Sequence, residues 1–141
     1  MKRSEGLYVC LLFGLGFVYL SGGVACGHLN YRLNEESAQA STKAIRYAER
    51  RFASENTERK FGTLQELAES ALIDSQLTTG TKDGYRFNLN VSGQSYKFTA
   101  VPVTYDQSGS WSFYVDESGI VRGTADNRQA TANDVPVRYQ E

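Results

Sequence analysis

Cysteine and histidine are almost absent from this chain. The two cysteines, Cys10 and Cys26, both lie in one apolar stretch near the N-terminus, and His28 is the single histidine. The rest of the chain therefore has no thiol for a disulfide or a nucleophile, and a zinc or copper site at His28 would lack further His or Cys ligands. A Ser-His-Asp triad within a soluble domain is excluded for the same reason. We expect a non-enzymatic protein without catalytic residues, cofactor or bound metal.

An excess of positive charge is also missing. The chain has 15 basic and 16 acidic side chains, which are spread along its length and give a net charge of -1. No basic stripe of the kind that binds phosphate backbones is present, so we expect no nucleic-acid partner, and we expect no small-molecule substrate. A length of 141 residues leaves room for one modest soluble domain.

The chain does have one long run without formal charge, the 22 residues from Gly6 to Gly27. As a helix this run would span roughly 33 Å, close to the hydrocarbon thickness of a bilayer. Lys2 and Arg3 precede it and would hold that end in the cytoplasm by the positive-inside bias. We therefore predict that residues 1–29 form a membrane anchor or signal segment. As an anchor, it would place the chain in the cytoplasmic membrane as a single-pass protein with the rest of the chain outside.

The same stretch is also typical of a secretory signal, since an apolar region follows a short basic start. Gly23-Val24-Ala25-Cys26 is similar to a bacterial lipobox, in which the cysteine becomes the lipidated first residue of the mature protein. A lipobox usually opens with a large aliphatic residue, and Gly23 holds that place here. The sequence is thus compatible with a membrane anchor and with a cleaved signal peptide. The signal-peptide interpretation depends on Cys26.

An amphipathic helix is predicted after residue 31. Ser41, Ile45, Ala48 and Phe52 recur at spacings of four, three and four, so they share one face. The opposite, solvated face is expected to hold Lys43, Arg46, Glu49 and Arg50. We expect this helix to continue the apolar segment through a short break or bend near Gly27. The result would be a long N-terminal helix that is apolar in its first half.

A second, short helix is predicted within residues 63–74. Thr63 and Glu66 form the capping-box pattern, in which a hydroxyl and a carboxylate each meet an unpaired backbone N–H of the first turn.

From Gly84 onward the apolar period changes to two, which is typical of half-buried strands. Four strands are expected, over residues 85–91, 95–103, 111–116 and 119–124. They predict an α+β fold in which the long helix packs on an antiparallel sheet of three or four strands. The globular domain would span residues 30–130, and residues 131–141 read as a polar C-terminal tail.

Aromatic side chains supply the predicted core between sheet and helix. The core positions are Tyr85, Phe87, Tyr96, Phe98, Phe113 and the neighbouring Trp111. Tyr105, Tyr114 and Tyr139 are not assigned to the core, and they could instead form a small exposed aromatic patch.

Four segments resemble a group of bacterial pilin-like proteins, in the same order. They are NEESAQAS at 34–41, FGTLQELAESALID at 61–74, GTKDGYRFNLNV at 80–91 and SFYVDESGIVRGTAD at 112–126. With their connecting segments they cover most of residues 34–130. The resemblance is to type IV pilins and pseudopilins, and it implies a pilin-like fold with other pilin or pseudopilin subunits as partners. It also implies a minor or accessory subunit of a type IV pilus or a type II secretion-like filament, with a possible place in a cell-surface filament.

The N-terminus departs from the pilin pattern. A prepilin leader is basic and ends in Gly before the cut, and a Glu stands at the fifth mature position. Gly6 is in register for the leader and Leu7 for the first mature position, which makes these two the candidate processing residues, but Leu11 replaces the Glu. In the family that Glu is thought to pair with a neighbour's N-terminal amine inside the filament, where an unpaired charge is costly. The alternative is an envelope lipoprotein that is anchored through Cys26 and uses the pilin fold as a binding module.

Overall fold

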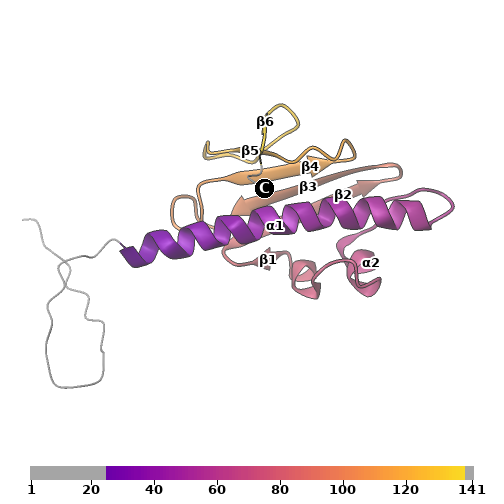
Figure 1. The fold of residues 1–141 in the computed structure, drawn as a ribbon, viewed down its shortest axis with the longest axis horizontal. Coiled ribbons are helices and arrows are strands. Elements are labelled where there is room, and N and C mark those ends of the chain that lie inside the picture. Colours follow the sequence, from indigo (N-terminus) through magenta and orange to yellow (C-terminus); the bar gives the residue numbers. More distant parts are fainter. Residues whose placement is uncertain (1–24, 139–141) are drawn as a thin grey trace, which may run out of the picture.

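One long helix lies along one face of an antiparallel sheet in the computed structural model, which describes residues 25–138 (Figure 1). The helix is α1 (Ala25–Glu55), and the six strands are ordered β1 to β6, so that each strand pairs with the next. The strands are β1 (Thr81–Lys82), β2 (Tyr85–Ser92), β3 (Ser95–Pro102), β4 (Ser112–Asp116), β5 (Arg122–Thr124) and β6 (Val135–Pro136). Helix α2 (Leu64–Glu69) and the 3₁₀ helix η1 (Ser75–Thr79) lie on the β1 side of α1.

The strand count predicted from the sequence is wrong, because the sheet has six strands rather than three or four. The two additional strands, β1 and β6, contain two residues each, too few to show an alternating pattern. β6 lies within the 131–141 segment that was expected to be a tail, and Val135 pairs with Gly123 of β5.

The expectation of a long helix with an apolar first half is also corrected. Among residues 25–138 no helix combines the length and the hydrophobicity that a membrane crossing requires. The reason is that α1 carries charge early, with Arg32, Glu35 and Glu36 in its first half. Most of the uncharged run, including residues 6–24, lies outside the described residues.

The second helix and its capping box are confirmed. The Oγ1 of Thr63 accepts a hydrogen bond from the N–H of Glu66 at 3.3 Å, and Oε2 of Glu66 accepts one from the N–H of Thr63 at 2.7 Å. Two of the unpaired backbone donors at the start of α2 are thereby satisfied. The helix turns Leu67 into the core, where it is fully buried.

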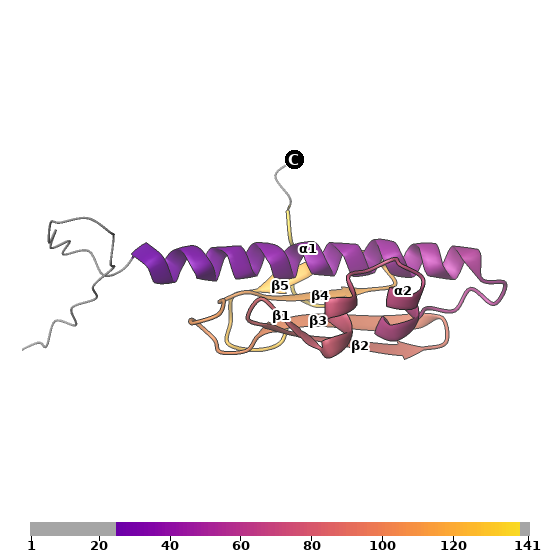
Figure 2. The same cartoon turned by 90° about the horizontal axis from the view of Figure 1, so that it is seen from below.

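The predicted core is confirmed on both faces that form it. Ile45 and Ala48 of α1 are buried against the aromatic side chains of the sheet. The buried aromatic residues of the prediction are Tyr85, Phe87, Tyr96, Phe98 and Phe113. These side chains fill the layer between α1 and the sheet, which Figure 2 shows edge on.

Three side chains contradict the predicted burial. Trp111 is 37% exposed although the sequence indicated a core position, and Tyr114 is 6% exposed although it was an alternative for an exposed patch. Strand alternation explains Tyr114: Phe113 faces α1, so Tyr114 faces away from it. Ser112 shares that far face and donates to the carbonyl of Arg128 at 2.7 Å, so the chain before β6 passes over this face. The third side chain is Glu49, which was predicted to lie on the solvated face of the helix but is 0% exposed.

Candidate functional site

Most of the residues predicted to carry processing or orientation lie outside the described residues. These are Lys2, Arg3, Gly6 and Leu7, and Tyr139 is outside as well. Cys26 lies within α1, close to the first residue that the structure describes.

One carboxylate fixes the segment between β3 and β4 to the first half of α1. Oε1 of Glu35 accepts hydrogen bonds from the backbone N–H of Ser110 at 2.7 Å, from its Oγ at 3.0 Å and from the N–H of Trp111 at 3.2 Å. Beside it, Nδ2 of Asn34 donates to the carbonyl of Ser108 at 3.0 Å. These contacts hold the β3–β4 loop, residues 103–111, against α1.

The β3–β4 loop is also held by bonds within itself. The carbonyl of Thr104 accepts from the N–H of Ser108 at 2.9 Å, and the N–H of Asp106 donates to the carbonyl of Gly109 at 2.9 Å. Behind the loop, Oη of Tyr85 donates to the carbonyl of Trp111 at 2.8 Å. The backbone comes so close to this ring that a Cβ on Gly109 would stand 2.1 Å from Oη of Tyr85. Glycine is required at position 109 by this close approach.

Several large apolar side chains of the β3–β4 loop and of the first half of α1 are exposed. Val103 is 47% exposed and Trp111 37% exposed in the loop, and Leu33 of α1 is 53% exposed. Burial raises the pKa of Tyr105, and the charges of Asp106 and Tyr31 raise it further. Figures 1 and 2 both place the loop beside the first turns of α1. We call the β3–β4 loop together with residues 31–33 the helix-start end.

A groove of about 390 Å³ opens on one side of the helix-start end. It runs between α1 and the chain that follows β5. Its lining includes Arg32, Glu36, Trp111, Val135 and Arg138. Two guanidinium groups and two carboxylates, those of Glu35 and Glu36, therefore surround an apolar floor.

A second groove, of about 470 Å³, lies on the face of the sheet that points away from α1. Asn88 and Thr99 stand opposite each other on β2 and β3, and Arg86 and Gln129 flank them. Its lining combines the apolar side chains of Phe87 and Val101 with hydroxyl, amide and guanidinium groups, and it contains no carboxylate.

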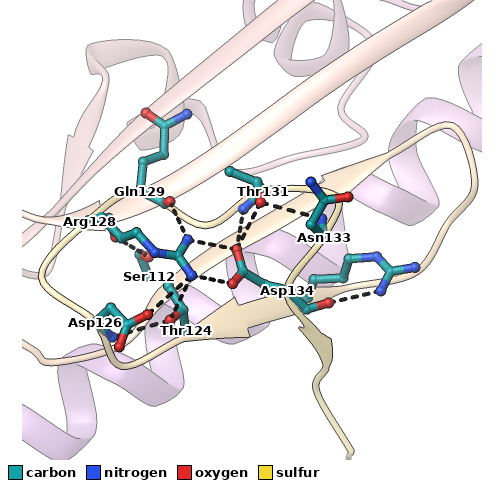
Figure 3. Close-up of polar contacts among 9 residues, drawn as sticks. Ser112, Thr124, Asp126, Arg128, Gln129, Thr131, Asn133 and Asp134 are labelled. Atoms are coloured by element: carbon teal, nitrogen blue, oxygen red, sulfur yellow. Dashed lines mark hydrogen bonds and ion pairs between the residues drawn. The ribbon is translucent and has the colours of Figure 1, made fainter.

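The chain before β6 is held down by one ion-pair network (Figure 3). The guanidinium of Arg128 binds both carboxylate oxygens of Asp134, at 2.9 and 2.5 Å, and lies 3.1 Å from Asp126. Asp134 also accepts from the backbone N–H of Thr131 at 2.8 Å. The hydrogen bonds and the positive charge of Arg128 lower the pKa of Asp134, and Thr131 lowers it further. This bidentate pair closes the loop between β5 and β6.

Glu49 is the one carboxylate that α1 turns into the core in the described part of the helix. Its Oε2 accepts from the N–H of Gly62 at 2.9 Å, and its Oε1 has no hydrogen-bond partner within residues 25–138. Nε of Arg46 and Oη of Tyr96 are likewise buried without a partner there. Burial raises the pKa of Glu49 to about 7, although the Gly62 N–H acts in the opposite direction. The group therefore changes charge near neutral pH.

Across the described chain no three His, Cys, Asp or Glu side chains are placed to hold a metal ion together. Comparison of the sequence and structure with protein-family models, with curated proteins and with solved structures found no match. The features that can carry a function are therefore argued from this chain alone: the long helix, the helix-start end and the two grooves.

Sequence reasoning missed Glu35, Glu49 and the exposure of Trp111. A signal for Glu49 was present, because it follows Ile45 by four residues and such pairs share a helix face. No comparable signal exists for Glu35, whose partners in Ser110 and Trp111 lie 75 and 76 residues further along the chain.

Proposed function

We propose that the protein is a non-enzymatic, membrane-anchored, pilin-like subunit with a minor or accessory role in a type IV pilus or a type II secretion-like filament. Residues 6–27 would hold it in the cytoplasmic membrane, and the domain would lie outside. Other pilin or pseudopilin subunits are its expected partners.

The observation that carries this proposal is the path of α1. The described part of α1 runs for 31 residues, from Ala25 near the end of the uncharged run to Glu55, along the whole sheet. A domain fixed to such a helix is mechanically coupled to whatever segment precedes it. Asn34, Glu35 and Arg46 each form a hydrogen bond with a loop of the sheet. These three residues of α1 therefore attach the helix to the sheet.

The exposed face of α1 supports a role in assembly. Ala40, Ala44 and Tyr47 point away from the sheet at spacings of four and three, and Tyr47 is 60% exposed. Small side chains let another helix approach closely, and an exposed tyrosine is a frequent contact residue in interfaces.

The test is photo-crosslinking in the protein's own cells, with a photoreactive phenylalanine analogue in place of Tyr47. The proposal expects crosslinks to filament subunits from this position. The matched control is the same analogue at Asn90, which is exposed on the opposite face of the sheet. Crosslinks that are absent from position 47, or that are equal at both positions, would argue against a filament role.

The second candidate is the envelope lipoprotein anchored through Cys26. A cut before Cys26 would leave residues 26–55 of α1 on the mature protein, so the helix that packs on the sheet would be retained. Metabolic labelling with a fatty acid distinguishes the two candidates: label that is lost on Cys26→Ser supports the lipoprotein, and an unlabelled chain supports the anchored subunit.

A further inference from the structure

We propose that the groove of about 390 Å³ between α1 and β6 binds a neutral saccharide, with one sugar ring stacked on the indole of Trp111. We call this groove the Trp111 groove. The saccharide is a ligand of the folded domain rather than a substrate, so the inference goes beyond the filament role and does not depend on it. The volume of the groove lies at the lower end of the range for ligand pockets, about 300–1,000 Å³, and therefore fits one or two sugar rings.

The backbone of Trp111 is fixed from two sides. Its N–H donates to Oε1 of Glu35 on α1 at 3.2 Å, and its carbonyl accepts from Oη of Tyr85 on β2 at 2.8 Å. The same oxygen of Glu35 accepts from the N–H of Ser110 at 2.7 Å. The residue that carries the indole is therefore attached to both layers of the domain before any ligand binds, which lowers the entropy that binding costs.

The indole lies against a glycine of β5. A Cβ on Gly123 would stand 3.2 Å from Cε3 of Trp111 and 3.0 Å from Cγ2 of Val137. Glycine within a strand often marks the close approach of another group, and here it lets the indole lie near the strand backbone. Trp111 is nevertheless 37% exposed, and its exposed part lines the groove. The C–H groups on one side of a sugar ring can pack on the negative face of such an aromatic ring.

Polar side chains flank the indole on both sides of the groove. Those on α1 recur at spacings of three and four and so form one row, which consists of Arg32, Glu35, Glu36 and Gln39. Arg138 lies across the groove from this row. Two arginines and two glutamates give the lining a formal net charge of zero, so a neutral ligand fits it better than an ion.

The same side chains offer donors and acceptors together. Guanidinium groups only donate and carboxylates only accept, whereas each sugar hydroxyl can do both. A planar guanidinium or carboxylate can also form two parallel bonds, which matches two neighbouring hydroxyls of a sugar ring. None of the ion pairs in the described part of the chain involves Arg32, Glu36 or Arg138. Binding a saccharide therefore breaks no ion pair there.

The open edge of β6 disfavours an extended peptide in this groove. Val135 pairs with Gly123, and the N–H of Val137 donates to the carbonyl of Val121 at 2.9 Å. Backbone direction alternates along a strand, so Pro136 is the residue of β6 whose backbone faces away from β5. Proline has no N–H, and a strand that pairs at this edge would lack that hydrogen bond.

Trp111 is the only tryptophan of the chain, so its fluorescence reports on this groove. The experiment titrates the full chain, in a detergent without a sugar headgroup, with cellobiose, maltose, lactose, mannobiose and the disaccharide of N-acetylglucosamine. The proposal expects a saturable change of Trp111 emission with at least one of them, with a Kd below about 10 mM. Sorbitol, which has hydroxyl groups but no ring, is the matched control and should give no saturable change.

Three substitutions locate the binding. Trp111→Ala should abolish it, and Glu36→Ala should weaken it about tenfold without changing stability, because Glu36 is exposed. The matched control is Tyr47→Ala, which removes a 60% exposed aromatic ring from another face of α1 and should leave binding unchanged. Saturation-transfer NMR measures binding in all three variants, since it does not need tryptophan. Circular dichroism verifies that each variant is folded.

The inference fails if no disaccharide gives a saturable change, if sorbitol acts as they do, or if Trp111→Ala binds as tightly as the unchanged chain. A proline-rich peptide is titrated as well. If it binds at Trp111 and no disaccharide does, the groove belongs to a protein partner and the saccharide is excluded. None of these results decides the filament role, which crosslinking from position 47 tests separately.

Discussion

Oε2 of Glu49 accepts a hydrogen bond from the backbone N–H of Gly62 at 2.9 Å and joins the buried side of α1 to the segment before α2. A Cβ on Gly62 would stand 3.0 Å from the ring of Phe52 and 3.2 Å from Leu67, so this junction is tightly packed. A carboxyl group in such a place prefers its neutral form, because a buried charge loses its hydration.

Glu49 is expected to make the stability of the domain depend on pH. The folded protein holds this proton more tightly than the unfolded chain, since its pKa is raised from 4.5 to about 7. Its contribution is complete below pH 4.5 and is lost as pH rises to about 7, by about 3 kcal/mol in total. The titratable groups that act on it or are acted on by it are Glu66 on α2 and the hydroxyl of Tyr96 on β3, whose pKa is raised mainly by burial.

The measurement is urea unfolding of the full chain in detergent at pH 5 and pH 8. Glu49→Gln keeps an acceptor for Gly62 without the charge, so the fall in stability between these pH values should shrink by about 2 kcal/mol. Glu69→Gln, at an exposed position of α2, should leave the fall unchanged. If the stability of Glu49→Gln falls between pH 5 and pH 8 as much as that of the unchanged chain, another group causes the pH dependence.

Glu35→Ala is expected to detach the β3–β4 loop from α1. The substitution leaves the N–H groups of Ser110 and Trp111 without their acceptor, at a cost of about 2 kcal/mol. Thermal unfolding measures the loss, and faster hydrogen exchange in residues 103–111 locates it. Glu36→Ala is the control, because Glu36 is exposed and should change stability by less than about 0.5 kcal/mol. Equal effects of the two substitutions would contradict the role of Glu35.

Gly109→Ala is expected to destabilise the domain by about 2–3 kcal/mol, because the new methyl group overlaps the hydroxyl of Tyr85. Adding Tyr85→Phe removes the nearest atom and should restore part of the stability, while ring carbons at 2.7 and 2.8 Å prevent full recovery. Chemical unfolding of the single and double variants measures the difference. If Gly109→Ala leaves the stability unchanged, the backbone at residue 109 is not as close to Tyr85 as this contact indicates.

Asp134→Asn is expected to open the loop before β6, because it breaks the bidentate pair with Arg128. The pKa of Asp134 is lowered by this pairing, so its stabilisation is present above the ordinary pKa near 3.8 and is lost as pH falls further. Hydrogen exchange in residues 125–134 should rise in the variant. Asp126→Asn, at a side chain that is 72% exposed, should have a much smaller effect.

The amphipathic patterns predicted most of the elements because each spans enough residues to show its period. The alternation in β2 and β3 identified Tyr85, Phe87, Tyr96 and Phe98 as core, and the capping box located the start of α2. Two-residue strands such as β1 and β6 carry no period and were missed.

Each error in the predicted site has its own physical cause. Trp111 follows the alternating pattern but lies just before β4 begins, where the loop rather than the strand decides its direction. Glu49 was assigned to water by its charge, although its spacing from Ile45 places it on the buried face. Contacts between segments far apart in the sequence, such as that of Glu35 with Ser110, leave no local pattern to detect.

The central claim is that the mature protein keeps its uncharged segment in the membrane as a pilin-type subunit. Mass spectrometry of the N-terminal peptide, from protein purified out of its own cell membranes, tests this most directly. The account predicts a mature N-terminus at Leu7, directly after Gly6. A chain that begins with a diacylglyceryl Cys26, or that retains Met1 uncut, would contradict it.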